Sequence, residues 1–168
     1  MKNVIWIMGP TSSGKTTTAQ KLMNELANRC IPSIHYDGDE VREFFGDKLG
    51  FTTEDRLRVV KTIVHLTNKA IDAGLNVVVS ALTANDDARV FIRENIMDLK
   101  IVYLDCSIDT CIKRDPKGLY QDALQGKIDT LSGINTKYEP INDPDIVIES
   151  EGTTPEENTN IILDTLFK

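Results

Sequence analysis

The sequence predicts an α/β fold in which a five-stranded parallel sheet carries helices on both faces. Five short apolar runs are separated by segments long enough for helices, and this alternation is typical of a parallel sheet. The runs cover residues 4–8, 33–36, 76–79, 100–104 and 145–148. A chain of 168 residues can bury a core of its own, so we expect one domain over residues 1–168.

Capping residues predict where the helices begin and end. Thr52, with an aspartate three residues later, forms a capping-box pattern before a long helix, and Gly74 follows that helix as a stop. Thr154 begins the last helix, within the sequence T-P-E-E. Asn85 and Ser107 begin two more helices, because acidic residues in the first turn suit the helix dipole.

Residues 9–16, GPTSSGKT, fill every fixed position of the phosphate-binding pattern G-x-x-x-x-G-K-[ST]. They follow the first apolar run and open a helix, as that pattern requires. The glycines let successive backbone N–H groups point at phosphate oxygens, and the helix adds its positive end. The sequence therefore predicts a P-loop NTPase fold that binds a nucleoside triphosphate. The residues expected to hold it are Gly9, Thr11, Ser12, Ser13, Gly14, Lys15, Thr16 and Thr17.

Two side chains of this loop have predicted chemical roles. Lys15 should reach the outer phosphates, and the Thr16 hydroxyl should be a ligand of Mg²⁺, which bridges phosphate oxygens during transfer. We therefore expect Mg²⁺ to accompany the triphosphate.

Two carboxylates follow the second predicted strand, in the sequence D-G-D-E-V-R at residues 37–42. Ligands of a parallel sheet lie beyond the carboxyl ends of its strands, so Asp37 and Asp39 should face the same crevice as the phosphate loop. An Asp-Gly pair is also an ordinary turn signal. A kinase, however, needs a carboxylate that orients the acceptor hydroxyl and helps to hold the metal, and Asp39 is the candidate for both roles.

Three further residues suit an acceptor that is itself an anionic nucleotide. Arg42 and Arg56 carry guanidinium forks for phosphate-like groups, and Phe51 offers a ring face for a base. Any one of them could be structural, and Phe51 could equally be a staple residue before its helix.

Residues 115–142, called the lid segment below, show weak periodicity and several glycines, prolines and lysines. A long loop inside a compact domain is usually functional or disordered. Its lysines could be ordinary surface charges, but kinases close over their phosphates to exclude water. We therefore expect a mobile covering segment.

Composition excludes several classes of protein. The net charge of −7 gives no basic footprint for a nucleic acid or an anionic membrane. Three cysteines, Cys30, Cys106 and Cys111, show no C-x-x-C spacing, so we expect buried free thiols rather than a disulfide or zinc site. The first apolar run is too short for a signal peptide, and no run approaches a membrane span. We expect a cytoplasmic protein.

Taken together, these motifs resemble the adenylylsulfate kinase family, which uses MgATP to phosphorylate the ribose 3'-hydroxyl of adenosine 5'-phosphosulfate. The resemblance rests on GPTSSGKTT, DGDEVR at 37–42, GFTTEDR at 50–56, RDPKGLY at 114–120, and GINTKYE at 133–139 followed by proline. It implies a lid with Arg114 and Lys117 near the nucleotides. It also implies a homodimer, since relatives are often homodimers, and an acceptor site. The acceptor residues are Asp37, Asp39, Arg42, Phe51 and Arg56.

Three departures from the family pattern cluster where the family holds the adenylyl group. Val59 replaces an asparagine, Ala84 replaces a serine, and Leu131 replaces a phenylalanine that closes an aromatic sandwich. Loss of stacking and of polar partners would change acceptor discrimination. We therefore expect a nucleotide acceptor that is not adenylyl, such as cytidine diphosphoramidate, with adenylylsulfate kinase proper as the alternative.

Two other classes fit the sequence less well. A GTPase-like switch would need N-K-x-D, and the nearest match, at residues 68–71, ends in isoleucine. A kinase for a small metabolite without a base would not need Phe51 or the lid segment.

Overall fold

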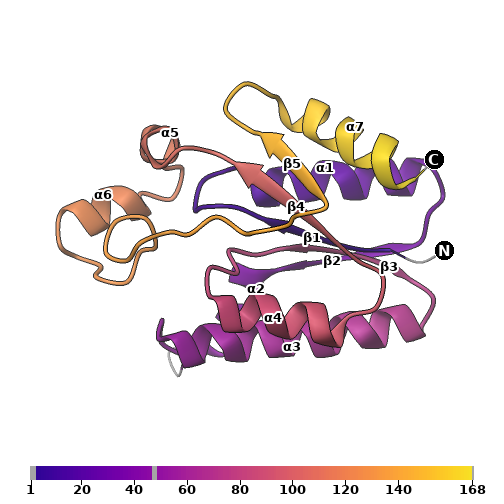
Figure 1. Cartoon of the computed structure of the whole chain (residues 1–168), viewed down its shortest axis with the longest axis horizontal. Coiled ribbons are helices and arrows are strands. Elements are labelled where there is room, and N and C mark those ends of the chain that lie inside the picture. The colour runs from indigo at the N-terminus through magenta and orange to yellow at the C-terminus, as the bar shows by residue number, and fades with distance from the viewer. Residues whose placement is uncertain (1–2, 47–48, 168) are drawn as a thin grey trace.

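The computed structural model describes residues 3–46 and 49–167, whose five strands form one parallel sheet in the order β2-β3-β1-β4-β5 (Figure 1). The strands are β1 (Val4–Met8), β2 (Ser33–Asp37), β3 (Asn76–Ser80), β4 (Leu99–Asp105) and β5 (Ile146–Glu149). All five predicted strands are confirmed, to within a residue or two at each end. The predicted α/β fold is therefore correct.

Helices cover both faces of the sheet (Figure 1). They are α1 (Lys15–Asn28), α2 (Gly38–Phe44), α3 (Thr53–Asp72), α4 (Asp86–Asn95), α5 (Ile108–Arg114), α6 (Leu119–Leu124) and α7 (Pro155–Leu166). Figure 1 shows α3 and α4 on one face, α1 and α7 on the other, and α5 and α6 beyond the carboxyl ends of the strands. The lid segment therefore lies at the edge of the sheet where parallel strands place their ligands.

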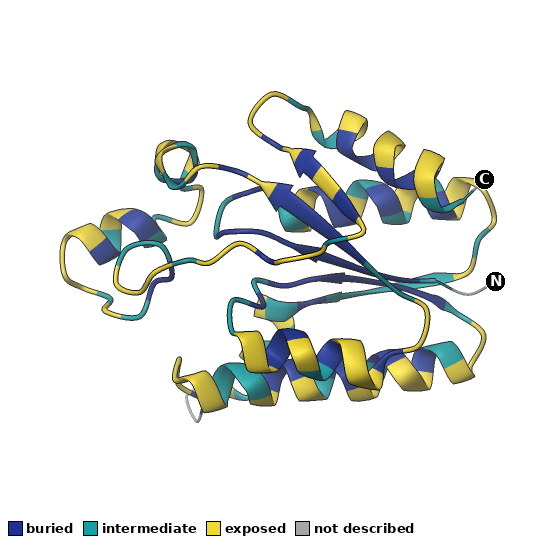
Figure 2. Cartoon of the chain, in the orientation of Figure 1, coloured by how far each residue is buried: buried dark blue, intermediate teal, exposed yellow. Residues whose placement is uncertain are grey.

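The central strand β1 supplies both hydrophobic cores, because successive side chains of a strand point to opposite faces. Trp6 packs with Ile63 of α3 and Ile92 of α4. Ile7 packs with residues of α1 and α7 on the other face. Every residue of β1 is buried, as the dark blue centre of the sheet in Figure 2 shows. A fixed central strand holds the phosphate loop that follows it.

Most predicted caps are confirmed. The Thr52 side chain accepts a hydrogen bond from Asp55 N, Ser107 accepts one from Thr110 N, and Thr154 forms a complete capping box. Asn85 is the exception: within the described chain its side chain makes no cap hydrogen bond, although α4 begins where it was expected. The acidic first turn of α4 compensates the helix dipole instead.

Two short helices were not predicted. Helix α2 begins directly after Asp37, whose side chain accepts from Asp39 N, so the Asp-Gly pair starts a helix rather than an isolated turn. Helix α6 lies inside the lid segment and follows Gly118, which has a left-handed backbone. Its six residues are too few to give a clear helical period.

The expectation of buried thiols holds for Cys106 and Cys111 but is wrong for Cys30, which is exposed. Cys30 ends the turn after α1 with φ 55°, and that left-handed turn carries it outward. Across the described ranges, we find no helix with the length and apolar character needed to cross a membrane.

Candidate active site

The phosphate loop joins β1 to α1 and has the conformation that its glycines allow. A Cβ on Gly9 would lie 2.7 Å from the Leu104 carbonyl oxygen and 2.7 Å from Ser13 Oγ. Ser12 and Gly14 both have positive φ, at 64° and 95°. Alternation of this kind turns backbone N–H groups into one concavity, which suits an anion.

Two polar groups inside the loop fit a phosphate chain. Ser13 is buried, and its Oγ has no hydrogen-bond partner among the described atoms. The Lys15 ammonium donates a hydrogen bond of 2.7 Å to the Pro10 carbonyl, so it lies across the mouth of the loop. An unpartnered buried hydroxyl beside a cation is the pattern that a bound anion would satisfy.

The electrostatics of Lys15 differ from those of a surface lysine. Burial lowers the pKa of Lys15 to about 8, although the negative charges of Asp39 and Asp37 act in the opposite direction. Phosphate oxygens would favour the charged form, so binding of a triphosphate should couple to protonation of this lysine.

Asp37 connects the carboxyl ends of two strands to the first turn of α1. Its Oδ2 accepts from Thr16 Oγ1 at 2.7 Å and from Ser80 Oγ at 2.6 Å, and its Oδ1 accepts from Asp39 N at 2.8 Å. Burial alone would raise the pKa of Asp37, but these hydrogen bonds outweigh it and lower the pKa. Asp37 is thus held as a carboxylate beside Thr16.

The donor set around Thr16 fits a magnesium ion. Thr16 Oγ1 and Asp37 Oδ2 are both hard oxygen ligands, and they lie 2.7 Å apart. The described residues contain no group of three or more His, Cys, Asp or Glu that could hold a metal alone. Mg²⁺ in phosphate-binding sites usually takes one or two protein oxygens and completes its ligands with waters and phosphate oxygens.

Asp39 lies in the first turn of α2, where it is exposed and paired with the lid segment. Lys117 donates a hydrogen bond of 2.7 Å to Asp39 Oδ2, and this bond raises the pKa of Lys117. Exposed ion pairs of this kind contribute little to stability, so the pair can exchange partners at low cost. The Lys117–Asp39 pair is therefore a weak link between the lid segment and α2.

Three predicted acceptor residues lie together, with Arg42 on α2, Phe51 in the loop after it and Arg56 in the first turn of α3. The Arg42 guanidinium lies 4.5 Å from the centre of the Phe51 ring, and Arg56 donates to the Phe51 carbonyl at 3.1 Å and to the Thr130 carbonyl at 2.7 Å. Phe51 is half exposed, so it is a ring face open to solvent and not a core staple. Burial lowers the pKa of both arginines, and the charge of Arg42 lowers that of Arg56 further. Two neighbouring cations suit an anionic group.

The three departures from the family pattern lie in different packing environments. Val59 is buried in the core between the sheet and α3. Leu131 is buried in a separate cluster with Cys106, Cys111, Tyr120 and Ala123. Ala84 lies in the loop after β3 and is partly exposed. Apolar packing accounts for Val59 and Leu131 without reference to the acceptor.

The remaining predicted residues, Arg114, Thr17 and Thr11, lie around the phosphate loop and the lid segment. Arg114 is exposed at the end of α5 and donates to the Ser150 carbonyl at 2.8 Å, so it fastens the start of the lid segment to the end of β5. Thr17 is exposed on α1. Thr11 contributes its carbonyl oxygen, which accepts a hydrogen bond of 3.0 Å from Tyr120 Oη.

Two residues of the site were not predicted. Tyr120 is fully buried in the lid segment and connects it to the phosphate loop. Ser80 binds the Asp37 carboxylate from the end of β3. Asp37 and Ser80 are the last residues of two parallel strands, and the strand register places them side by side. That position at the strand ends was the signal in the sequence that could have pointed to Ser80.

The phosphate loop, the carboxylate beside Thr16 and the covering segment define a P-loop phosphotransferase. The family model for adenylylsulphate kinase matches residues 1–149. An adenylyl-sulfate kinase of Oceanobacillus iheyensis is 35% identical over 95% of this chain and 81% of its own length. A probable adenylyl-sulfate kinase of Archaeoglobus fulgidus is 34% identical over 90% of this chain and 97% of its own. The chain belongs to the adenylylsulfate kinase family.

Solved structures agree with this assignment. The Mycobacterium tuberculosis APS kinase CysC in complex with AMPPNP and APS matches with a TM-score of 0.94 and 27% identity, over 99% of this chain and 98% of that one. A shikimate kinase from Aquifex aeolicus matches with a TM-score of 0.57 and 23% identity, which shows the shared fold alone. The chain is therefore a phosphotransferase with an alcohol group as acceptor, and it uses ATP with a metal. The expected preference for a cytidine acceptor finds no support among these relatives.

We predict that Gly9→Ala weakens ATP binding by at least about tenfold, because the new Cβ would displace the Leu104 carbonyl or Ser13 and distort the loop. Isothermal titration calorimetry measures the affinity. Gly152→Ala is the matched control, since its Cβ would meet nothing within 4 Å. Equal ATP affinity of Gly9→Ala and the wild type would show that the loop does not need this close approach.

The lowered pKa of Lys15 predicts a pH dependence of ATP binding. Below about pH 8 the ammonium is already charged, and ATP affinity should be flat. Above that pH, Lys15 must take up a proton when ATP binds, and ATP affinity should fall by up to about tenfold per pH unit. Calorimetry across that range tests this, with Lys15→Arg as a variant that stays charged and should give a flat profile. A flat profile for the wild type as well would contradict the assigned environment of Lys15.

Proposed function

We propose that this protein is an adenylylsulfate kinase, which transfers the γ-phosphoryl group of MgATP to the ribose 3'-hydroxyl of adenosine 5'-phosphosulfate. The observation that carries the proposal is the group formed by Arg42, Phe51 and Arg56, between α2 and the first turn of α3. It offers two cations and a ring face, which an anionic nucleotide needs and a small uncharged alcohol does not. The names of the relatives support the adenylyl acceptor.

The residues divide the reaction between a donor side and an acceptor side. Lys15 and the loop amides bind the phosphates, and Thr16 with Asp37 beside it provides oxygen ligands for Mg²⁺, which neutralises charge on the donor when bound. Asp39 orients the 3'-hydroxyl. The new bond joins the 3'-oxygen to the γ-phosphorus, the bond to the β,γ-bridging oxygen breaks, and the hydroxyl proton leaves through Asp39 or water.

Lys117 completes the donor side in this proposal. It is paired with Asp39, and we expect it to exchange that carboxylate for a phosphate oxygen when ATP binds. Asp39 is then released to the acceptor. The exchange makes acceptor activation depend on the donor, which limits hydrolysis of ATP by water.

Cytidine diphosphoramidate is the second candidate acceptor, on the strength of Ala84 in the loop at the end of β3. A methyl there cannot hydrogen-bond a purine, and Leu131 supplies no second ring. The packing of Val59 and Leu131 in separate clusters weakens this candidate. The homodimer and the cytoplasmic location expected from the sequence stay predictions.

The test is a transfer assay with γ-labelled ATP and three acceptors: adenosine 5'-phosphosulfate, cytidine diphosphoramidate and shikimate. We expect labelled product chiefly from the first. Asp39→Asn should reduce transfer by about 10²-fold or more, because it removes the carboxylate that orients the hydroxyl. Asp87→Asn, an exposed acidic change in the first turn of α4, is the control and should behave as the wild type.

Two results would contradict the proposal. Better turnover of the cytidine compound would restore the second candidate. Label in shikimate, or in none of the three, would exclude the nucleotide 3'-kinase assignment altogether.

A further inference from the structure

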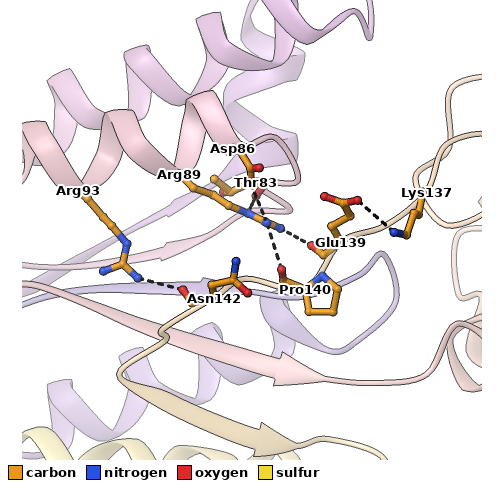
Figure 3. A network of polar contacts seen from close by, with 8 residues as sticks. All are labelled: Thr83, Asp86, Arg89, Arg93, Lys137, Glu139, Pro140 and Asn142. Atoms are coloured by element: carbon orange, nitrogen blue, oxygen red, sulfur yellow. Dashed lines mark hydrogen bonds and ion pairs between the residues drawn. The ribbon is translucent and has the colours of Figure 1, made fainter.

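Two arginines of α4 fasten the chain where the lid segment ends (Figure 3). Arg89 donates to the carbonyl oxygens of Glu139 at 2.6 Å and Pro140 at 3.3 Å. One turn further along, Arg93 donates to the Asp143 carbonyl at 2.6 Å. Figure 3 shows both side chains reaching from the helix to the loop that precedes β5.

The two arginines differ in burial. Arg89 is 7% exposed, whereas Arg93 is exposed. The one ion pair of Arg89 recorded among the described residues is to Asp86, whose side chain is 79% exposed. A buried charge is expensive unless it is hydrogen-bonded, and here carbonyl oxygens supply most of the partners. The guanidinium therefore depends on a fixed arrangement of the backbone around it.

A third carbonyl comes from the acceptor side of the crevice. Arg89 Nε donates at 3.0 Å to the Thr83 carbonyl, in the loop between β3 and α4. Thr83 has φ 43°, a conformation that a threonine adopts only when its surroundings impose it. Its hydroxyl also accepts a hydrogen bond of 3.0 Å from Trp6 Nε1. The next residue, Ala84, is one of the predicted acceptor residues.

Arg89 thus joins two walls of the crevice: the loop that carries Thr83 and Ala84, and the end of the lid segment at Glu139. The other end of the lid segment depends on different contacts. Tyr120 binds the phosphate loop, and Lys117 binds Asp39. Loss of Arg89 should therefore disturb the acceptor side and leave the ATP side in place.

We propose that Arg89 is a positioning residue for the acceptor nucleotide, because it sets the spacing between the loop after β3 and the end of the lid segment without touching the substrate. The role rests on the proposed function, in that the acceptor occupies this side of the crevice. Arg93 holds the same loop further along, at Asp143, and has no such role.

The kinetic test compares Arg89→Met with Arg93→Met. For Arg89→Met we expect the KM of the acceptor to rise by at least about tenfold and kcat to fall, with the KM of ATP within about twofold of the wild type. For Arg93→Met all three constants should stay within about twofold. The acceptor is whichever nucleotide the wild type phosphorylates, so failure of the proposed acceptor is separable from failure of this role.

A second measurement does not depend on turnover. Trp6 is the only tryptophan of the chain, and it is buried against Thr83, so its fluorescence reports on this loop. Arg89→Lys keeps a charge but cannot reach three carbonyl groups at once. We expect it to show altered Trp6 emission and faster tryptic cleavage after Lys127 and Lys137, while ATP affinity by calorimetry stays at the wild-type value. The Arg89→Lys variant also tests the positioning role if Arg89→Met does not fold.

The proposal is overturned by equal rises in both KM values, or by wild-type kinetics together with a lowered melting temperature, which would mark Arg89 as merely structural. It is likewise overturned if Arg93→Met raises the acceptor KM as much as Arg89→Met. Wild-type fluorescence and cleavage of Arg89→Lys, when Arg89→Met does not fold, would have the same force.

Discussion

The site depends on one buried carboxylate. Asp37 lies at the carboxyl end of β2 and accepts hydrogen bonds from the first turn of α1, from the end of β3 and from the first turn of α2. Since α1 carries the phosphate loop and α2 carries Asp39, this carboxylate sets the donor side and the acceptor side at a fixed distance. A buried carboxylate is tolerated only because several hydrogen bonds favour its charged form.

The lid segment is attached at several points that differ in strength. Its buried contacts, through Tyr120 and Arg89, are hydrogen bonds to backbone carbonyls. Its exposed contact, between Lys117 and Asp39, is an ion pair that water and salt weaken. Arg56 also holds the middle of the segment, through a hydrogen bond of 2.7 Å to the Thr130 carbonyl. The segment is therefore held firmly at several points and weakly at Lys117, near its start, where it can open locally. This division suits an enzyme that must admit two nucleotides and then exclude water.

The sequence predicted the parallel sheet, because apolar runs that alternate with helical segments are compatible with few topologies. It also predicted the phosphate loop, because glycines at those spacings allow the backbone to curl around an anion. It was insufficient where several distant segments meet. The Arg89 network joins residues about fifty positions apart, and no local pattern marks it. The same limit applies to Val59 and Leu131: substitution against a family pattern does not reveal that these side chains pack in apolar clusters. Helices α2 and α6 are too short to show a period.

The most direct test of this account is MgATP binding by Asp37→Asn, measured by calorimetry beside Asp98→Asn. Asp98 lies in the exposed turn before β4 with φ 54°, a conformation that asparagine tolerates, so it is a matched control. The account predicts a folded Asp37→Asn protein whose MgATP affinity falls by at least about tenfold, because the charged hydrogen-bond acceptor of Thr16 is gone. Unchanged MgATP affinity in that variant would contradict the central place given to this carboxylate.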